Sequence, residues 1–446
     1  MYPADTIAAI ATAPGRAGIG VIRVSGPATS AIAAGVLNRV LNARVATLCD
    51  FLDGQFTLLD RGIAIFYTAP HSYTGEDVLE LQGHGGLAVL QLVLRRCIEL
   101  GARPANPGEF TQRAFQNDKL DLAQAESVAD LIDASSTTAA KSAMRSLAGE
   151  FSNRVIQLNR ALVELRMLVE ATLDFPEEEI DILQSSGALE KLNGLSEGVK
   201  ALANEARLGK ILRDGVKVVL IGQPNVGKSS LMNRLAEEEV AIVTAIPGTT
   251  RDPLRYELVI DGVPVHVVDT AGLRHAADAV EKIGIEWAWR EIRQADLALL
   301  VVDATAGFTA ADHSIASELP TSIRRIFIFN KIDIITKEPL EAWSGDQIEI
   351  WLSAKTGAGV GLLRAALLRS IGWHPPEEGT FSARERHLEA LIAAQMSLRR
   401  ALKASASLEL MAEELRLAQQ CFARITGEFS ADDLLGEIFS RFCIGK

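Results

Sequence analysis

The stretch VKVVLIGQPNVGKSSLMNRLA, residues 216–236, decides how the middle of this 446-residue chain folds. VKVVLI is mostly apolar and β-branched, as in a buried strand, and SSLMNRLA has the apolar spacing of a helix. Between them, GQPNVGKS at 222–229 matches the pattern GxxxxGKS/T, whose glycines let backbone N–H groups surround phosphate oxygens at a helix N-terminus. We therefore predict a strand, a phosphate-binding loop and a helix. An ordinary glycine-rich turn is disfavoured, because the motif lies between a strand and a helix, as a phosphate-binding loop requires.

Four further strand-like runs follow this loop along the chain. They are VPVHVVD, LALLVVD, RIFIFN and IEIWLS, and helical stretches separate most of them. Alternation of strands and helices predicts a mostly parallel sheet that is covered by helices. The pattern stops near WHPPEEG at 373–379, so we predict a P-loop nucleotide-binding domain over residues 211–372.

The rest of the chain has two other patterns. Residues 1–118 mix strand-like runs such as GIGVIRVSG with a helix-like stretch, GLAVLQLVLRRCIELGA, which predicts an α+β module. Residues 119–210 and 373–446 are rich in helical patterns, and apolar side chains at 155–173 recur at steps of three and four. Because each helical half alone would form a poorly closed core, we predict one helical domain with the P-loop domain inserted into it.

Composition restricts the surroundings and the partners of the protein. The formal net charge is −12 and the pI is near 5.2, so a nucleic-acid partner would need a local basic patch or a second protein. No apolar run reaches the roughly 18 residues of a membrane span, and the N-terminus is a poor secretory signal. The four cysteines show no metal-ligand spacing. We expect a cytoplasmic protein with no membrane partner.

Two motifs at the ends of later strands indicate which base the site selects. NKID lies at 330–333, and its Asp333 can accept two hydrogen bonds from guanine, a pair of donors that adenine lacks. SAK at 353–355 follows the next strand and would close over the edge of the base. NKID alone is a weak four-letter match to a guanine-binding motif. It becomes a strong match at this distance after the phosphate loop, with DTAG between them, so an ordinary solvated loop at 330–333 is less favoured.

The intervening motifs supply ligands for the phosphates and for Mg²⁺. Lys228 would reach the β- and γ-phosphates, and the Ser229 hydroxyl would bind Mg²⁺. DTAG at 269–272 places Asp269 to hold the metal through water and the Gly272 N–H to sense the γ-phosphate. Thr250, in PGTTRD, offers a second hydroxyl for the metal. With these motifs in order, the chain resembles the P-loop GTPases.

One position departs from the Ras-like pattern. Leu273 stands where such GTPases have a glutamine that orients the attacking water. Glu281 could take this role, although the sequence alone favours an ordinary solvated glutamate at a helix start. Asn225 either fills the phosphate loop or binds a cation beside the phosphates, which would supply the charge of an arginine finger.

The order of all these motifs resembles one family along essentially the whole chain. TIAAIATAPGRAGIGVIRVSG at 6–26, NDKLDLAQAE at 117–126, then PNVGKSS, PGTTRD and DTAGLR, and finally CIGK at 443–446 are similar to the MnmE family, also called TrmE, of tRNA-modification GTPases. The resemblance implies a folate-binding and dimerising module at 1–118. It also implies a helical domain at 119–210 and 373–446 that carries an inserted GTPase domain.

The resemblance further implies the residues that bind GTP and its ions. Ser229 and Thr250 would hold Mg²⁺, and Glu281 matches the catalytic glutamate that positions the attacking water through a second water, contrary to the interpretation from sequence alone. A K⁺ ion between dimerised GTPase domains would be bound by Asn225, Thr244, Ile246 and Thr249. The implied GTP-binding set is Asn225, Val226, Gly227, Lys228, Ser229, Ser230, Thr244, Ala245, Ile246, Pro247, Gly248, Thr249, Thr250, Asp269, Thr270, Ala271, Gly272, Asn330, Lys331, Asp333, Ser353, Ala354 and Lys355.

A second implied site takes 5-formyl-tetrahydrofolate or a related tetrahydrofolate. The residues that match its contacts are Arg23, Glu80, Lys119 and Lys446. Cys443 matches a candidate catalytic thiol at this site, and a thiolate there could act as a nucleophile, or the thiol could only pack. Lipidation of Cys443 is disfavoured because Lys446 is not a typical prenylation terminus.

The family acts with an FAD-dependent partner, MnmG. We therefore expect a homodimer that forms a heterotetramer with MnmG and adds an aminomethyl or carboxymethylaminomethyl group to the 5-position of the wobble uridine of certain tRNAs. Potassium-stimulated GTP hydrolysis would drive dimerisation of the GTPase domains and a conformational change. A regulatory switch or assembly factor is the alternative, and folate binding by residues 1–118 would favour the enzyme. Membrane remodelling is disfavoured, since a basic amphipathic helix is missing.

Overall fold

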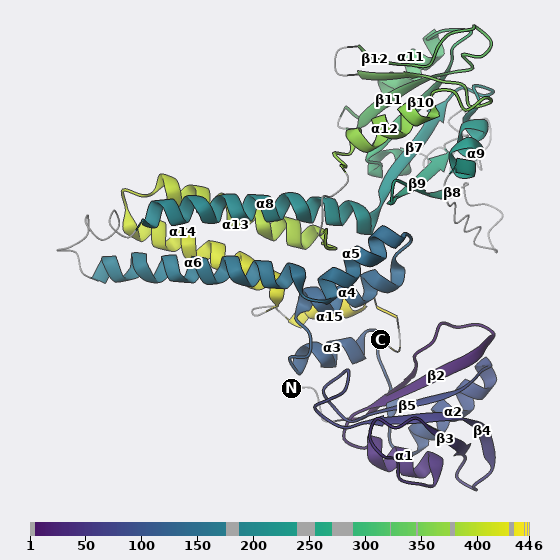
Figure 1. Cartoon of the computed structure of the whole chain (residues 1–446), viewed down its shortest axis with the longest axis vertical. Helices are drawn as coiled ribbons and strands as arrows, with labels where there is room; N and C mark the ends of the chain where they lie inside the picture. The colour runs from purple at the N-terminus through teal and green to yellow at the C-terminus, as the bar shows by residue number, and fades with distance from the viewer. Residues whose placement is uncertain are drawn as a thin grey trace. The chain divides into compact units, whose positions relative to one another are not determined.

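The structure is a computed structural model, and it divides into two compact units (Figure 1). Unit 1 joins Met1–Ala129, Ser146–Lys200 and Ala390–Lys446, and unit 2 joins Asp130–Arg145 and Ala201–Glu389. No helix in the described part of the chain is long and apolar enough to cross a membrane. The structure describes residues 5–174, 187–238, 255–269, 289–321, 323–344, 347–374, 380–427, 432–440, 442–443 and 445.

A six-stranded sheet forms the N-terminal part of unit 1. Its strand order is β3-β4-β5-β2-β1-β6, and all neighbours are antiparallel except β1 and β6. Helices α1 (Thr29–Leu37) and α2 (Leu87–Glu99) pack against one face of the sheet, where they share a core with Ile22, Val24 and Leu81. The strands are β1 (Ile7–Ile10), β2 (Ala17–Ser25), β3 (Thr47–Leu52), β4 (Leu58–Tyr67), β5 (Val78–Gly85) and β6 (Arg103–Pro104).

The other face of this sheet carries polar side chains, because successive residues of a strand point to opposite faces. Arg23 lies between the core residues Ile22 and Val24, and it pairs across the strands with Glu80. Helix α3 (Glu109–Gln116) adds Phe110 to a small second core on this face. This face, which we call the open face, therefore carries the Arg23 and Glu80 pair beside the aromatic ring of Phe110.

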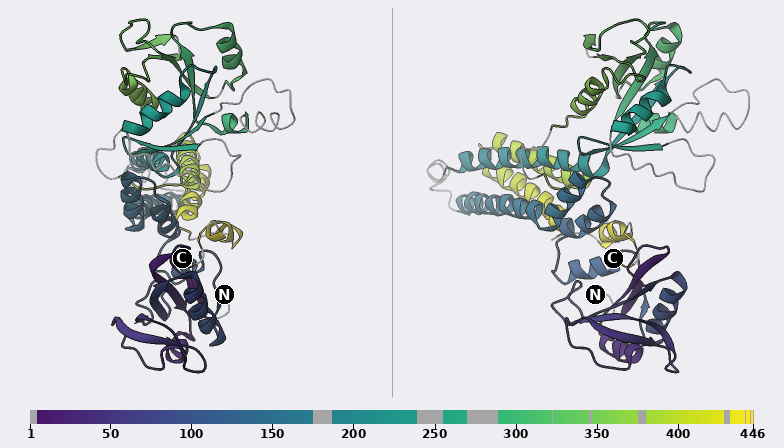
Figure 2. Two further views of the ribbon diagram at one scale, coloured as in Figure 1. Left: turned by 90° about the vertical axis from the view of Figure 1, so that its right-hand side faces the viewer. Right: turned by 45° about the vertical axis from the view of Figure 1, so that its right-hand side comes forward.

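The helical part of unit 1 is built on α6 (Glu150–Asp174) and α14 (Leu408–Thr426), which lie side by side (Figures 1 and 2). The apolar face that the sequence predicts at 155–173 is buried at Val155, Leu162 and Val169. A hydrogen bond of 2.8 Å from Arg166 Nη1 to Gln419 Oε1 adds a polar contact between α6 and α14. Helix α15 (Asp432–Ser440) also belongs to unit 1, α5 (Thr137–Leu147) lies mostly in unit 2, and the residues of α4 (Leu122–Asp133), α8 (Ala188–Asp214) and α13 (Glu385–Lys403) are divided between the two units.

Unit 2 contains a seven-stranded sheet in the order β12-β13-β11-β10-β7-β9-β8. The pairs β13–β11, β11–β10, β10–β7 and β7–β9 are parallel, which confirms the predicted mostly parallel sheet. Only β8 and β12, which the sequence analysis does not predict, run antiparallel at the two edges. The strands are β7 (Val216–Gly222), β8 (Arg255–Ile260), β9 (Val263–Asp269), β10 (Leu297–Asp303), β11 (Arg324–Asn330), β12 (Leu340–Ser344) and β13 (Gln347–Trp351).

Apolar cores lie on both faces of the unit 2 sheet. Leu299 and Val301 of β10 face one core, while Leu300 and Val302 face the other, so the strand is buried on both sides. This explains the nearly continuous apolar runs of the sequence, which are typical of parallel strands. Helices α9 (Lys228–Glu238), α11 (Ala310–Glu318) and α12 (Val360–Ser370) belong to this unit.

Candidate functional site

The phosphate-binding loop follows β7 and leads into α9, as the sequence predicts. Gly227 has a φ of 97°, and a Cβ added there would lie 2.3 Å from Nδ2 of Asn330, so only glycine fits. The Lys228 ammonium donates to the carbonyl oxygens of Gly222 and Gln223 at 2.7 and 2.9 Å. Lys228 is thereby held inside the loop, where the β- and γ-phosphates of a nucleotide would bind.

The loop is anchored to α11 by a contact that sequence reasoning missed. Gln223 Nε2 donates to Thr309 Oγ1 at 2.8 Å and to Asp312 Oδ1 at 2.9 Å. Thr309 and Asp312 also form the capping box of α11, and Asp312 is buried. The T-x-x-D pattern at 309–312 was the available signal, since such a pattern begins helices.

Asn330 joins the three predicted motifs of the nucleotide site. Its Nδ2 donates to the Val226 carbonyl at 2.8 Å, and its Oδ1 accepts from the Ala354 N–H at 2.9 Å. Next to it, Asp333 Oδ1 accepts a hydrogen bond of 2.6 Å from Ser353 Oγ. The phosphate loop, NKID and SAK therefore meet at one end of the parallel sheet, where α/β folds bind their ligands.

Two further side chains that sequence reasoning missed support the base-binding end. Asp303, at the end of β10, accepts a hydrogen bond of 2.6 Å from Lys331 Nζ. Burial alone would raise the pKa of the Asp303 carboxyl, but hydrogen bonds from Lys331 and Thr305 bring it below its ordinary value. Arg234 of α9 donates to the carbonyl of Lys355 at 2.9 Å and so fixes SAK to the helix that follows the phosphate loop.

The predicted ion ligands divide into two groups. Ser229 and Ser230 are exposed in the first turn of α9, and Asn225 is exposed with a φ of 62°. The amide of Asn225 has no hydrogen-bond partner among the residues that the structure describes, so its oxygen fits a cation ligand. The backbone of Asp269 pairs with Leu220 of β7. Outside the described residues lie Thr244, Ala245, Ile246, Pro247, Gly248, Thr249, Thr250, Thr270, Ala271, Gly272, Glu281 and Lys446.

On the open face of the N-terminal sheet, Arg23 and Glu80 form a partly buried ion pair. Arg23 Nη2 and Nε lie 2.8 and 3.1 Å from Oε1 of Glu80. The guanidinium also lies over the rings of Tyr73 and Phe110, 5.4 and 5.8 Å from their centroids. These contacts hold Arg23 in place, and Oε2 of Glu80 accepts no hydrogen bond within the described part of the chain.

One loop, residues 69–77, contacts both Arg23, through the ring of Tyr73, and Lys119, through the carbonyl of Pro70. Lys119 Nζ donates to the Pro70 carbonyl at 3.0 Å, and the Tyr73 hydroxyl bonds Thr111 Oγ1 at 2.8 Å. Burial raises the pKa of Tyr73, so the phenol stays protonated at neutral pH. The structure thus places three of the predicted folate residues around one loop, and it adds Tyr73, for which the sequence carries no signal.

The C-terminal tail lies against the same module. The Gly108 N–H donates to the Cys443 carbonyl at 3.4 Å, and Phe442 is buried beside α3 and α15. A Cβ on Gly445 would lie 2.3 Å from the carbonyl oxygen of Ile10, next to the cross-strand partner of Arg23. Cys443 itself is exposed. The tail therefore ends close to the strand that borders the Arg23 and Glu80 pair.

Comparison with known families shows to which family the chain belongs. Residues 122–443 match the family model described as the MnmE helical domain, and residues 6–119 match the model of the GTP-binding protein TrmE N-terminus. The chain belongs to the MnmE family. This confirms the resemblance that the order of the motifs indicates.

Full-length MnmE relatives share more than half of the sequence. The tRNA modification GTPase MnmE of Thiobacillus denitrificans is 57% identical over 442 residues, which cover 99% of this chain and 98% of that protein. The protein of the same name from Nitrosomonas europaea is 56% identical over 447 residues and covers 99% of each chain. That from Azoarcus sp. is 55% identical over 445 residues, covering 100% of this chain and 98% of the relative.

Proposed function

We infer that the chain is a tRNA modification GTPase, the activity for which its full-length relatives are named. The observation that carries the GTPase assignment is the set of hydrogen bonds by which Asn330 joins the phosphate loop to SAK, with Asp333 beside them. An aspartate in this place can accept the two N–H donors of guanine. Ser229 would hold Mg²⁺, whose charge would stabilise the transferred phosphate.

We propose that K⁺ takes the place of an arginine finger beside the phosphates. The amide of Asn225 is exposed at the rim of the loop and has no hydrogen-bond partner among the described residues, which supports this role, because its oxygen can face a cation without losing a bond to any of them. Thr244, Ile246 and Thr249 would complete the K⁺ site and Glu281 would position the attacking water, as the family resemblance implies. Hydrolysis would then drive dimerisation of the GTPase domains.

Substitution of Asn225 tests this cation site. We expect GTP turnover to be much faster in potassium than in sodium buffer, and Asn225→Gly to reduce the potassium rate roughly 100-fold, the loss typical for one stabilising group. Glycine removes the amide without straining the left-handed backbone. The control is Asn38→Gly, at another left-handed asparagine (φ 49°) far along the chain. Equal rates in both buffers would contradict the proposal and favour a switch activated by another protein.

We propose that the face around Arg23 and Glu80 binds 5-formyl-tetrahydrofolate or a related tetrahydrofolate. Oε2 of Glu80, which accepts no hydrogen bond from the described residues, can accept hydrogen bonds from the N–H groups of a pterin, while the Arg23 and Lys119 cations can attract the carboxylates of the glutamate tail. Lys446 would join them, since the neighbouring Gly445 lies against β1. Cys443 is proposed as the thiol that this site presents to the one-carbon unit.

The tail can be displaced from this face by a single methyl group. We expect Gly445→Ala to weaken binding of 5-formyl-tetrahydrofolate roughly 10-fold, because its Cβ would overlap the Ile10 carbonyl and move the tail. Gly436→Ala is the matched control, since a Cβ there meets nothing within 4 Å. Isothermal titration calorimetry measures both affinities. If Gly445→Ala binds as tightly as the control, the tail is not part of the site.

We propose that the protein is a homodimer that forms a heterotetramer with the FAD-dependent partner MnmG. Leu48 and Ile63 support the dimer, because they are 67% and 40% exposed and pair directly on the open sheet face. With MnmG, the tetrahydrofolate carbon would become part of an aminomethyl or carboxymethylaminomethyl group at the 5-position of the wobble uridine of certain tRNAs. The four unpaired cysteines fit a cytoplasmic location.

A further inference from the structure

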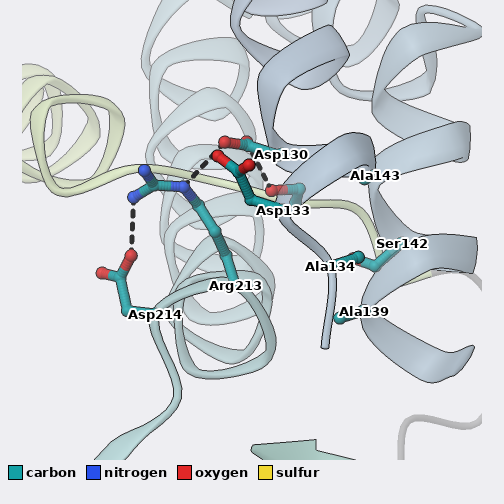
Figure 3. A pocket seen from close by; sticks show the side chains of 9 residues that line it. Asp130, Asp133, Ala134, Ala139, Ser142, Ala143, Arg213 and Asp214 are labelled. Carbon is teal, nitrogen blue, oxygen red and sulfur yellow. Dashed lines mark hydrogen bonds and ion pairs between the residues drawn. The ribbon is translucent and has the colours of Figure 1, made fainter. Parts of the chain in front are cut away.

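Both chain segments that lead into and out of the unit 2 sheet meet at one buried carboxylate. Asp130, near the end of α4, accepts a hydrogen bond from Arg213 Nε at 2.8 Å (Figure 3). It also accepts hydrogen bonds from Arg384 Nη2 at 2.7 Å and from Ser382 Oγ at 2.9 Å. Arg213 ends α8 just before β7, whereas Ser382 and Arg384 precede α13. We call these four residues the Asp130 clasp.

Further contacts bind the two segments to each other. Lys210 on the entry side pairs with Glu385 on the exit side at 2.8 Å. A Cβ on Gly209 would lie 1.9 Å from the carbonyl oxygen of Phe381, so the two backbones approach as closely as glycine allows. Leu212 belongs to the same apolar core as the strands of the sheet. The entry segment is therefore continuous with the sheet, and the exit segment is fixed to it.

The helix α5 is attached to the same body. Its carbonyl at Ser142 accepts from the Ser382 N–H at 3.2 Å, which links α5 to the exit segment. Ahead of α5, Ser136 Oγ donates to the carbonyl of Gly262, in the turn between β8 and β9, at 2.9 Å. Residues 130–145 thus contact the connections and the edge of the sheet, and all of them fall in unit 2.

The charges of the clasp make both connections depend on the same carboxylate, that of Asp130. Asp130 is 6% and Arg384 13% exposed, so water screens their attraction only weakly. Two guanidinium groups share the one carboxylate: Arg384 is largely buried, whereas Arg213 is 30% exposed and also pairs with Asp214 at 2.6 Å, so loss of the Asp130 charge would leave the buried Arg384 guanidinium in the less favourable position. Loss of the Asp130 charge would therefore weaken the hold on both connections at once, although the Lys210–Glu385 pair and the contact of Gly209 with Phe381 would remain.

We propose that the Asp130 clasp makes the GTPase sheet and residues 130–145 one moving body. This inference rests on the proposed function in a single respect, that GTP hydrolysis changes the conformation of the chain. The pivot of that change then lies outside the clasp, further along α8 and α13, and not at the two connections. Asp130 is a positioning residue in this scheme, since its hydrogen bonds are to Arg213, Ser382 and Arg384 and not to the phosphate loop, NKID or SAK.

Distances between two spin labels test the proposal in the full chain. The labels are attached through Lys141→Cys on α5 and Ser317→Cys on α11, both exposed positions of unit 2, with Cys421 and Cys443 replaced by serine. Pulsed electron paramagnetic resonance measures the distance with GDP and with GDP plus aluminium fluoride. We expect one narrow distribution that is the same in both states. A distance that changes between the states would overturn the proposal.

The matched variants are Asp130→Asn and Asp133→Asn. Asp133 lines the same cavity one helical turn away, and no hydrogen bond or ion pair of its side chain is found within the described residues (Figure 3). We expect Asp130→Asn to raise the population of open conformers on the order of 10- to 100-fold and to broaden the distribution, while Asp133→Asn stays narrow. An Asp130→Asn distribution as narrow as that of Asp133→Asn would overturn the proposal.

Two additions keep the test decisive. If Asp130→Asn does not fold, Ser382→Ala, which removes one hydrogen bond from Oδ2, is expected to broaden the distribution less but in the same way. Its failure to do so would count against the clasp. A second label pair, Arg160→Cys in unit 1 with Ser317→Cys, reports the conformational change itself. No change in that pair would contradict the proposed function and would leave the result for the clasp intact.

Discussion

Replacing Asp333 by asparagine lowers the affinity of the chain for GTP roughly 100- to 1,000-fold, because two charge-assisted hydrogen bonds to the base are lost. The amide of the new side chain would instead turn an N–H donor toward the 2-amino group of guanine. Xanthine has a carbonyl oxygen at that position, so Asp333→Asn should gain affinity for xanthosine triphosphate. Fluorescence titration with labelled GTP and labelled xanthosine triphosphate measures the two affinities and so this exchange of specificity.

The control for this exchange is Glu338→Gln, an exposed carboxylate five residues further along the same loop. We expect it to bind GTP as the unmodified chain does. The Ser353 hydroxyl, which now donates to Asp333, can still donate to the asparagine oxygen, so the local fold should survive. An Asp333→Asn variant with unchanged GTP affinity would show that the base is read elsewhere.

Replacing Glu80 by alanine should weaken binding of 5-formyl-tetrahydrofolate roughly 100-fold, the second largest effect that we expect. The variant removes the acceptor that we propose for the pterin N–H groups and leaves Arg23 without its carboxylate between the rings of Tyr73 and Phe110. Titration calorimetry gives the affinity, and GTP binding in the same sample shows whether the chain is folded.

The matched control is Gln82→Ala, two residues along the same strand and on the same face. Its side chain makes no hydrogen bond within the described residues, and we expect it to lower folate affinity by less than about threefold. If Glu80→Ala and Gln82→Ala lose the same affinity, the effect comes from the strand and not from the carboxylate. The ligand would then have to bind outside the Arg23 and Glu80 face.

The placement of the phosphate loop, NKID and SAK could be predicted from the sequence because it depends on local patterns. Gly227 is required by its own backbone conformation, and Lys228 bonds carbonyls within the same loop. NKID and SAK follow strands whose apolar runs are visible in the sequence, and parallel strands bring their ends together. The guanine contacts that we propose for Asp333 follow from this placement by simple hydrogen-bonding rules.

Contacts between residues that are distant along the chain could not be predicted in this way. Asp303 and Lys331 lie on neighbouring strands, and Asp130 and Arg384 are 254 positions apart. An aspartate in a helix has the same local pattern whether or not a guanidinium meets it. The edge strand β8 was not predicted for another reason. Its sequence, RYELVI, mixes charged with apolar residues, as half-exposed strands do, and so lacks the continuous apolar run of the central strands.

We propose that the chain uses GTP hydrolysis to transfer a tetrahydrofolate carbon to a tRNA uridine. The most direct test incubates the purified chain with MnmG, FAD, NADH, undermodified tRNA, GTP, Mg²⁺, K⁺, ammonium or glycine as the nitrogen source, and methylene-tetrahydrofolate labelled with carbon-13, followed by mass spectrometry of the nucleosides. We expect a wobble uridine whose 5-substituent carries the label, and no product when GTP is replaced by a non-hydrolysable analogue. Modified uridine without the label, or product formed without hydrolysis, would contradict the account.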